Sequence, residues 1–201
     1  MTLALALLLS TSGFASQTLT GRVLEINYNS YGLWNDYGGT SEGALTNFSG
    51  TGWTDWSYPG TPWQQLTIAW TQDGSAEEYD GSYYYGDWTV TREEDLSDSS
   101  SMVSVYEWSA GDLDFVKTES WGIRGSTVLI DVEISNRGSA DAENIRFSFG
   151  VDPDQDYGSG TYETYIDSLD LDGDLVNDFV QAVGFYSGWT IGFGACDPEA
   201  Q

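Results

Sequence analysis

The sequence predicts an all-β protein, an antiparallel β-sandwich of immunoglobulin-like or larger size with long loops. Apolar and polar residues alternate in several short segments, polar turns separate these segments, and helical periodicity is almost absent. About eight to ten short strands with polar turns are typical of a sandwich or a barrel. The chain has 9 Trp, 13 Tyr and 8 Phe in 201 residues, which argues against disorder and is enough to fill a sizeable core.

The N-terminus has the pattern of an export signal. The short apolar run of residues 3–9 is followed by Gly13 and Ala15, which fit the small −3 and −1 positions of a signal-peptidase site. A membrane span takes about 20 apolar residues, so this run is too short to be a transmembrane segment. The alternative to a signal peptide is a buried first strand. We expect residues 1–15 to be a bacterial signal peptide and residues 16–201 to form one β-sandwich domain, secreted or displayed at the cell surface.

The clearest strand covers residues 127–135, where Val128, Ile130, Val132 and Ile134 share one side. A turn over residues 136–144 follows, and residues 145–151 then alternate again. Because each segment has one apolar and one polar face, the two are expected to form an antiparallel pair.

Weaker alternation predicts further strands on both sides of this region. A pair of strands is expected at residues 102–108 and 114–121, across a turn at 109–112, and another pair at 179–186 and 189–193. Single strands are expected within residues 22–28, 65–70 and 86–91. Residues 29–62 are predicted as a long loop layer or irregular strands, and residues 93–101 as a solvated loop.

The stretch of residues 128–152 resembles the central hairpin of bacterial immunoglobulin-like surface domains, the CARDB type among them. The shared pattern is an alternating strand, then Asn136, Arg137 and Gly138 in an Asn-x-Gly turn, small residues with Asp141, and a second alternating strand. The resemblance implies a secreted or cell-surface module, often one for adhesion, and it brings no catalytic residues.

The charge balance limits the partners. The chain has 32 Asp and Glu against 6 Lys and Arg, a formal net charge of −26. Nucleic acids and anionic membrane surfaces need a basic footprint, so neither is an expected partner, and no membrane insertion is expected. The chain has no His, which excludes Ser-His-Asp and Cys-His catalysis and His-ligated zinc. Cys196, the only Cys, is either a free thiol or pairs with a cysteine beyond Gln201, in which case the domain is truncated at its C-terminus.

An acidic segment near the C-terminus predicts a calcium site. Its carboxylates at alternate positions repel one another unless a cation lies between them, and Ca²⁺ takes 6–8 oxygen ligands. The segment resembles the short calcium loops of thrombospondin type 3 and FG-GAP repeats, although Leu175 stands where those loops have glycine. The predicted ligands are Asp170, Asp172, Asp174 and Asp178.

A second acidic run holds Asp152, Asp154 and Asp156, around Pro153. It is interpreted as a second calcium site or as a donor of ligands to the first. For both runs the alternative is a solvated acidic turn between strands.

Aromatic residues in the loop-rich segment predict a ligand-binding surface or a core. Exposed Trp and Tyr beside Asn, Asp and Gln stack on sugar rings, whereas the same rings can also fill a core that is poor in Leu and Ile. The candidates for ligand binding are Trp53, Trp56, Tyr58 and Trp63.

These patterns predict a non-catalytic, calcium-binding module for adhesion or scaffolding, with an extracellular protein or glycan as its partner. One alternative is a carbohydrate-binding module attached to a secreted hydrolase. Another is a glycosidase, which needs two carboxyl groups about 5–9.5 Å apart in a cleft. No pattern in the sequence selects such a pair, so no catalytic residue is predicted.

Overall fold

The computed structural model describes residues 17–34, 44–47, 54–55, 64–81, 86–151, 164–170, 179–184 and 190–194. Among these residues all regular secondary structure is β-strand, and every strand pair is antiparallel. This confirms the predicted all-β class. The expected signal peptide lies outside the described residues. The strands are β1 (Gln17–Thr20), β2 (Leu24–Tyr28), β3 (Ala44–Thr46), β4 (Thr54–Asp55), β5 (Gln64–Gln72), β6 (Ser75–Gly81), β7 (Thr89–Asp95), β8 (Ser101–Ala110), β9 (Leu113–Gly122), β10 (Leu129–Asn136), β11 (Ala142–Val151), β12 (Thr164–Leu169), β13 (Phe179–Gly184) and β14 (Thr190–Gly194).

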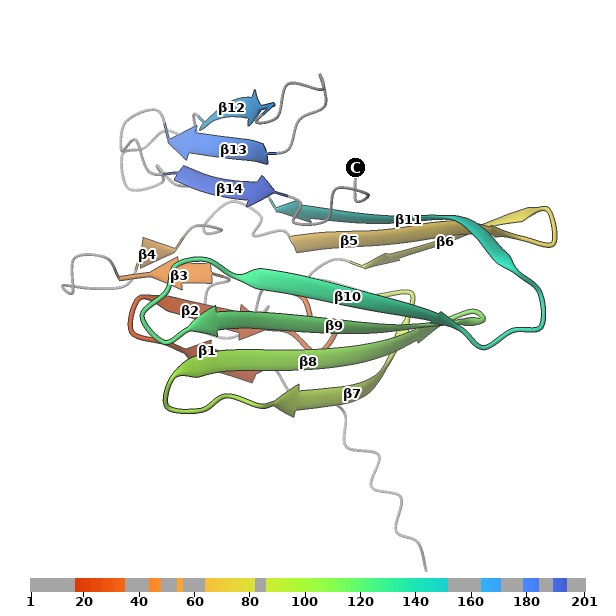
Figure 1. The fold of residues 1–201 in the computed structure, drawn as a ribbon, viewed down its shortest axis with the longest axis horizontal. Coiled ribbons are helices and arrows are strands. Elements are labelled where there is room, and N and C mark those ends of the chain that lie inside the picture. Colours follow the sequence, from red (N-terminus) through yellow and green to blue (C-terminus); the bar gives the residue numbers. More distant parts are fainter. Residues whose placement is uncertain are drawn as a thin grey trace, which may run out of the picture.

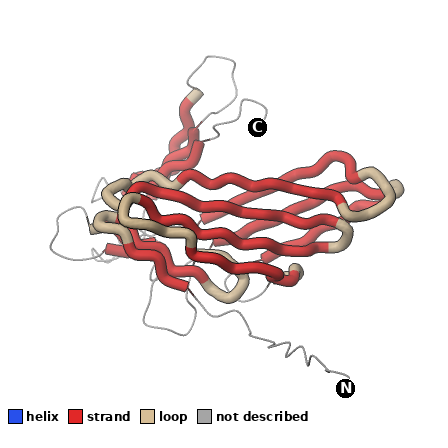
Figure 2. Tube along the Cα trace, turned by 60° about the horizontal axis from the view of Figure 1, so that its bottom comes forward, coloured by secondary structure: helices blue, strands red, loops and turns tan. Residues whose placement is uncertain are grey.

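The strands form two four-stranded and two three-stranded sheets. Their orders are β1-β2-β3-β4, β10-β9-β8-β7, β11-β5-β6 and β12-β13-β14. The long strands β7 to β10 form one layer, with β1 and β2 behind it, and β5, β6 and β11 extend to one side (Figure 1). The sheet of β12, β13 and β14 lies beyond these layers (Figures 1 and 2).

One hydrophobic cluster joins the sheets β1-β2-β3-β4, β10-β9-β8-β7 and β11-β5-β6. Ile26 of β2, Ile68 of β5 and Trp108 of β8 all belong to it, and each is almost fully buried. The Trp residues that the structure describes are all buried in it: Trp34, Trp70, Trp88, Trp108 and Trp121. For Trp34, which the sequence places among the loop aromatics, the core interpretation is therefore confirmed.

The predicted pairs at residues 102–121 and 179–193 are both formed. β8 pairs with β9 from Ser101↔Gly122 to Ala110↔Leu113, and β13 pairs with β14. Along β9 every second side chain is buried, which is the alternation expected of a strand with one face on the core. A tight turn also joins β5 and β6, where Asp73 and Gly74 both have positive φ (50° and 76°), as a two-residue hairpin turn requires.

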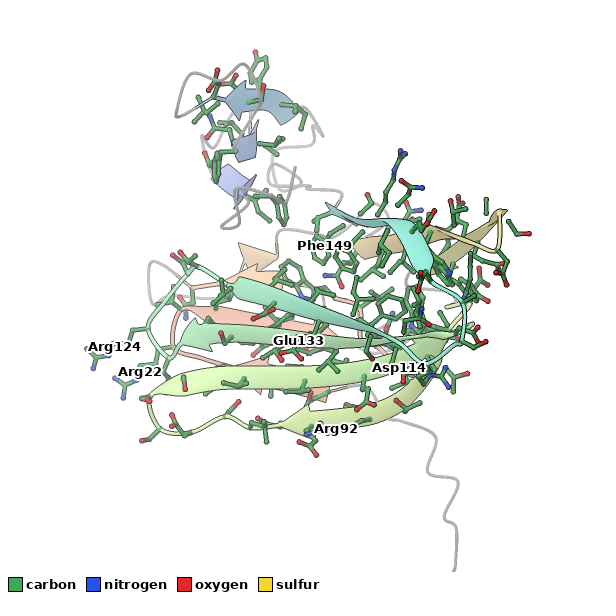
Figure 3. All side chains as sticks on the ribbon, turned by 45° about the vertical axis from the view of Figure 1, so that its right-hand side comes forward. Arg22, Arg92, Asp114, Arg124, Glu133 and Phe149 are labelled. Atoms are coloured by element: carbon green, nitrogen blue, oxygen red, sulfur yellow. The ribbon has the colours of Figure 1, made fainter. Side chains whose placement is uncertain are left out.

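The prediction that residues 127–135 pair with residues 145–151 is wrong. β10 pairs with β9, whereas β11 pairs with β5 in a different sheet. Both strands nevertheless turn apolar side chains such as Ile134 and Phe149 toward the same core (Figure 3 labels Phe149). Alternation fixes which face of a strand is buried but not which strand lies beside it, and the connection between them crosses from one sheet to another.

The β5–β6 turn, the β8–β9 turn and the β10–β11 connection meet at one end of the core. Arg137, between β10 and β11, forms an ion pair with Asp114 of β9 (2.9 Å) and donates a hydrogen bond to the Gly111 carbonyl (3.0 Å). Gln72 of β5 donates to the Asp112 carboxylate and to the Ala140 carbonyl, both at 3.2 Å. These contacts hold the crossing connection against the β8–β9 turn.

The predicted loop at residues 93–101 is shorter than expected. Residues 93–95 belong to β7, where Glu93 accepts a hydrogen bond from the Tyr106 hydroxyl (3.2 Å), so only residues 96–100 form the connection. Asp98 organises this connection, because its Oδ1 accepts hydrogen bonds from the backbone N–H and hydroxyl groups of Ser100 and Ser101 at 2.7–3.2 Å. Since these bonds favour the charged carboxylate, the pKa of Asp98 is lowered to about 2.

We predict that the Asp98 carboxyl titrates near pH 2 in the folded protein. Its folded pKa lies below its unfolded value, so its contribution to stability is complete above about pH 4 and is lost as the pH falls toward 2. NMR titration of the side-chain carboxyl measures this directly. A midpoint near 3.9, the value of an unperturbed Asp, would show that the four-donor turn does not form.

Candidate functional site

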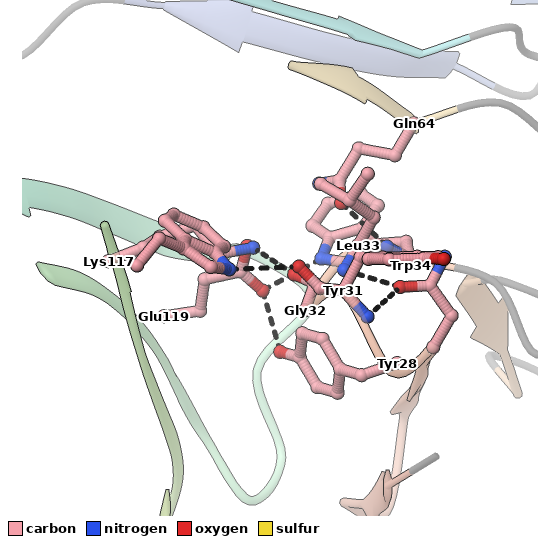
Figure 4. Close-up of polar contacts among 10 residues, drawn as sticks. Tyr28, Tyr31, Gly32, Leu33, Trp34, Gln64, Lys117 and Glu119 are labelled. Atoms are coloured by element: carbon pink, nitrogen blue, oxygen red, sulfur yellow. Dashed lines mark hydrogen bonds and ion pairs between the residues drawn. The ribbon is translucent and has the colours of Figure 1, made fainter. Parts of the chain in front are cut away.

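The described structure has one site where charged side chains meet deep in the core. Lys117 and Glu119 both lie on β9 two residues apart, so both point to the same face of the sheet. Each is 0% exposed, and Lys117 Nζ lies 2.6 Å from Glu119 Oε1 (Figure 4). Lys117 is also the only lysine of the chain.

Both charged groups are surrounded by polar partners from other elements. Glu119 Oε2 accepts hydrogen bonds from the Tyr28 hydroxyl (2.6 Å) and from the Trp34 indole N–H (2.7 Å). Lys117 Nζ donates to the Gly32 carbonyl oxygen (2.8 Å). A buried charge is costly unless it is paired and hydrogen-bonded, and here each charge has both kinds of partner.

Aromatic rings complete the surroundings of the ammonium group. Lys117 Nζ lies 5.6 Å from the ring centroid of Tyr28, 5.9 Å from that of Tyr106 and 5.5 Å from that of Trp108. At these distances the negative faces of the rings attract a cation. We call Lys117, Glu119, Tyr28, Tyr106 and Trp108 the buried ionic centre.

The segment from Asn29 to Trp34 is shaped to fit this centre. The Asn29 side-chain oxygen accepts hydrogen bonds from the N–H groups of Tyr31 (2.9 Å) and Leu33 (3.1 Å), which fold the segment into a tight turn. Gly32, at the tip, has φ of 75°, and a Cβ there would lie 2.6 Å from the Tyr106 ring. Only glycine suits both conditions.

Two further hydrogen bonds fix the same segment to two other sheets. The Trp34 N–H donates to the side-chain oxygen of Gln64 on β5 (2.6 Å), and the Trp108 indole donates to the Tyr31 carbonyl (2.9 Å). The segment therefore connects β2 with both β5 and the β8–β9 pair (Figure 4).

Electrostatics keep the two tyrosine hydroxyls of the centre protonated. Burial, followed by the negative charge of Glu119, raises the pKa of the Tyr28 hydroxyl well above its usual value. Burial likewise raises the pKa of Tyr106, with a further contribution from Glu93. Burial lowers the pKa of Lys117, and the charge of Glu119 opposes that effect. The buried ionic centre is closed to solvent. It therefore stabilises the packing of the core and is not placed to contact a substrate.

Sequence reasoning missed this centre, although a signal for it exists. Leu113, Phe115 and Trp121 are buried at alternate positions of β9, and Lys117 and Glu119 lie in the same phase. A lysine and a glutamate in register with an apolar strand face predict a buried pair.

The residues predicted from the sequence fall mostly outside the part of the chain that the structure describes. Of the predicted calcium ligands only Asp170 is described, and it is exposed directly after β12. The others, Asp172, Asp174, Asp178, Asp152, Asp154 and Asp156, lie outside the described residues, as do the ligand-binding candidates Trp53, Trp56, Tyr58 and Trp63. Among the described residues no group of three or more His, Cys, Asp or Glu is placed to hold a metal ion.

The described strands do show where both acidic runs are attached. Leu169 pairs with Phe179, so the segment between them starts and ends on neighbouring strands. Val151, just before the other acidic run, pairs with Gln64, which directly follows Trp63. Phe149 of β11 and Phe193 of β14 join the two regions, with ring centroids 5.8 Å apart. Both runs therefore leave the described strands near the junction of β11 with the β12–β14 sheet (Figure 1).

Comparison with models of known protein families, with curated proteins and with solved structures gave no match. In the described part of the chain, no helix has the length and apolar character needed to cross a membrane.

We predict that removing one charge of the buried pair is strongly destabilising. Lys117→Met leaves Glu119 buried without its counter-ion, which costs about 3–5 kcal/mol of unfolding free energy. The double variant Lys117→Met, Glu119→Gln recovers part of this loss, because a neutral amide still accepts hydrogen bonds from Tyr28 and Trp34. Urea denaturation followed by Trp fluorescence measures both.

The matched control is Arg92→Met, which removes the cation of the exposed Arg92–Glu94 pair (2.6 Å). Exposed ion pairs contribute little to stability, so its urea midpoint should stay close to that of the wild type. Equal midpoints for Lys117→Met and Arg92→Met would contradict a charged pair in the core.

Proposed function

We propose that the chain is an exported, non-catalytic β-sandwich module for adhesion or scaffolding, and that it binds calcium through the segment from Asp170 to Asp178. The observation that carries this proposal is the pairing of Leu169 with Phe179. It supports an acidic loop whose two ends are held together by a strand pair rather than an open acidic tail.

Loop closure favours ion binding because it reduces the entropy lost when the ligands converge. Asp170 follows Leu169 and Asp178 precedes Phe179, so the first and last predicted ligands are attached to neighbouring strands. Neighbouring strands lie about 4.8 Å apart, a separation that two carboxylates can bridge through one Ca²⁺ with ligand distances of about 2.3–2.6 Å. Asp172 and Asp174 supply the remaining carboxylates of the proposed site.

The second acidic run supports the same location. Asp152 directly follows Val151, at the end of β11 that carries Phe149, and Phe149 contacts Phe193 of the C-terminal sheet. We propose that Asp152, Asp154 and Asp156 donate further ligands or form a second site beside the first.

The distribution of the cations increases the need for an external counter-ion. Lys117 is buried with Glu119, Arg92 is paired with Glu94, and Arg137 is paired with Asp114. Half of the 6 cationic side chains are thus already paired internally, while the chain carries 32 acidic ones. A divalent ion from the medium offsets this repulsion where the carboxylates are most concentrated.

We further propose that the sheets are arranged as a β-sandwich. Tyr28 of β2 reaches Glu119 of β9 across the core (2.6 Å), which supports β1–β4 and β7–β10 as its opposing faces. A core fixed in this way suits a rigid module that presents its surface to an extracellular protein or glycan. The resemblance of residues 128–152 to the central hairpin of bacterial surface domains does not add support, because β10 and β11 lie in different sheets.

We predict that calcium raises the melting temperature of the processed chain. Ca²⁺ at about 100 times its Kd stabilises the folded state by about 2.7 kcal/mol, which corresponds to roughly 5–10 °C for a domain of this size. Differential scanning calorimetry with Ca²⁺ and with EDTA measures the shift. The variant Asp172→Asn, Asp174→Asn should lose most of it.

The matched control is Asp131→Asn on β10, which removes an exposed carboxylate that is remote from the loop in sequence. It should keep the full calcium shift. Equal shifts in the loop variant and in the wild type would show that the ion acts on the overall charge and not at the proposed site.

A further inference from the structure

Exposed apolar side chains gather on the C-terminal sheet. The large hydrophobic residues exposed in the described structure include Tyr165 (56%), Ile166 (68%) and Leu169 (39%) of β12 and Val180 (42%) of β13. The other exposed ones, Leu96, Leu129 and Ile145, lie singly on other elements. Because side chains alternate along a strand, Tyr165 and Ile166 point to opposite faces, so β12 is apolar and exposed on both sides.

Among the described strands β12 is an edge strand, and it differs from the other edges because it carries three large exposed hydrophobic side chains. It is the first strand in the order β12-β13-β14 and lies on the side of the sheet away from the main layers (Figure 1). The edge strands β6, β7 and β10 carry at least two acidic residues each, in the sequences SAEEYDG, TVTREED and LIDVEISN. The edge strands β1 (QTLT) and β14 (TIGFG) carry no charge, but neither has a large exposed hydrophobic side chain. The sequence of β12 is TYIDSL, with Asp167 as its only charge. Charged edges discourage pairing with a further strand, and β12 has little of this protection.

Charge decides which kind of strand fits this edge. Asp167 is exposed in the middle of β12, and the whole chain carries a net charge of −26. A second copy would bring an equal charge and an equal Asp167 to the contact. A basic segment would instead be attracted both by the overall charge and by Asp167.

We propose that β12 is a docking edge to which an extended segment of a partner protein, with alternating basic and apolar side chains, adds as a further strand. The partner's backbone pairs with the edge, one cationic side chain lies opposite Asp167, and apolar side chains cover Tyr165, Ile166 and Leu169. This names the partner chemistry of the adhesion or scaffolding module and rests on that proposed function.

The test uses a fluorescein-labelled probe peptide, Lys-Val-Thr-Lys-Val-Val-Lys, and fluorescence anisotropy with the processed chain in calcium. The peptide should bind, whereas Glu-Val-Thr-Glu-Val-Val-Glu should not. A third peptide, Lys-Val-Pro-Lys-Pro-Val-Lys, has the same charge but cannot form a regular strand, so it measures attraction by charge alone. The first peptide should bind at least about tenfold more tightly than the third, and equal binding of the two would overturn the proposal.

The decisive variant is Ile166→Thr, with Leu129→Thr as its matched control. Both residues are exposed on strands (68% and 53%), and threonine retains the β preference, so neither change should disturb folding. Ile166→Thr should weaken binding of the first peptide at least about fivefold, because it removes apolar area from the contact, and Leu129→Thr should leave it unchanged. An equal effect of the two variants would also overturn the proposal.

Self-association is a separate outcome of the same experiment. Sedimentation velocity that shows a dimer which Ile166→Thr dissociates would assign the edge to a second copy and contradict the basic partner. The calcium melt on the same samples separates the two proposals: a calcium shift without peptide binding overturns only the docking edge. Peptide binding without a calcium shift overturns only the calcium site.

Discussion

The ion pair between Lys117 and Glu119 is the interaction on which the rest of this structure depends. Its two charges lie at the centre of the hydrophobic cluster, and their partners come from β2, from the segment that follows β2, and from β8. A buried pair of this kind is costly to form, and it is stable only when all its partners are in place. It therefore specifies one arrangement of the sheets more sharply than apolar packing alone, which tolerates many alternatives.

The buried ionic centre fixes the core sheets but does not involve the C-terminal sheet of β12, β13 and β14. Gly32, Asn29 and Trp34 are fixed by the centre, so the β1–β2 region and the β8–β9 pair behave as one unit. The exposed strand β12 lies at the other side of β11, where Phe149 contacts Phe193 (Figure 1). A rigid core with an exposed apolar edge strand fits the module that we propose, which holds a partner at that edge.

The sequence predicts the class of the fold well and the pairing of strands less well. Alternation at residues 102–121 correctly predicts a hairpin because a short turn places its two strands side by side. The same signal at residues 127–151 predicts a hairpin that does not form, because both strands face one core from different sheets. Lys117 was overlooked because a charged residue is normally exposed, although its phase along β9 with Phe115 and Trp121 marks it as buried. The calcium ligands remain predictions, since all but Asp170 lie outside the described residues.

The most direct test of the buried ionic centre uses the fact that the chain has a single lysine. An amine-reactive ester applied to the folded protein, followed by peptide mass spectrometry, compares Lys117 with the α-amino group as an internal reference. Lys117 should react only after denaturation, because its Nζ is fully buried between Glu119 and the Gly32 carbonyl. Modification of Lys117 in the native protein at the rate of an exposed amine would contradict the ionic core.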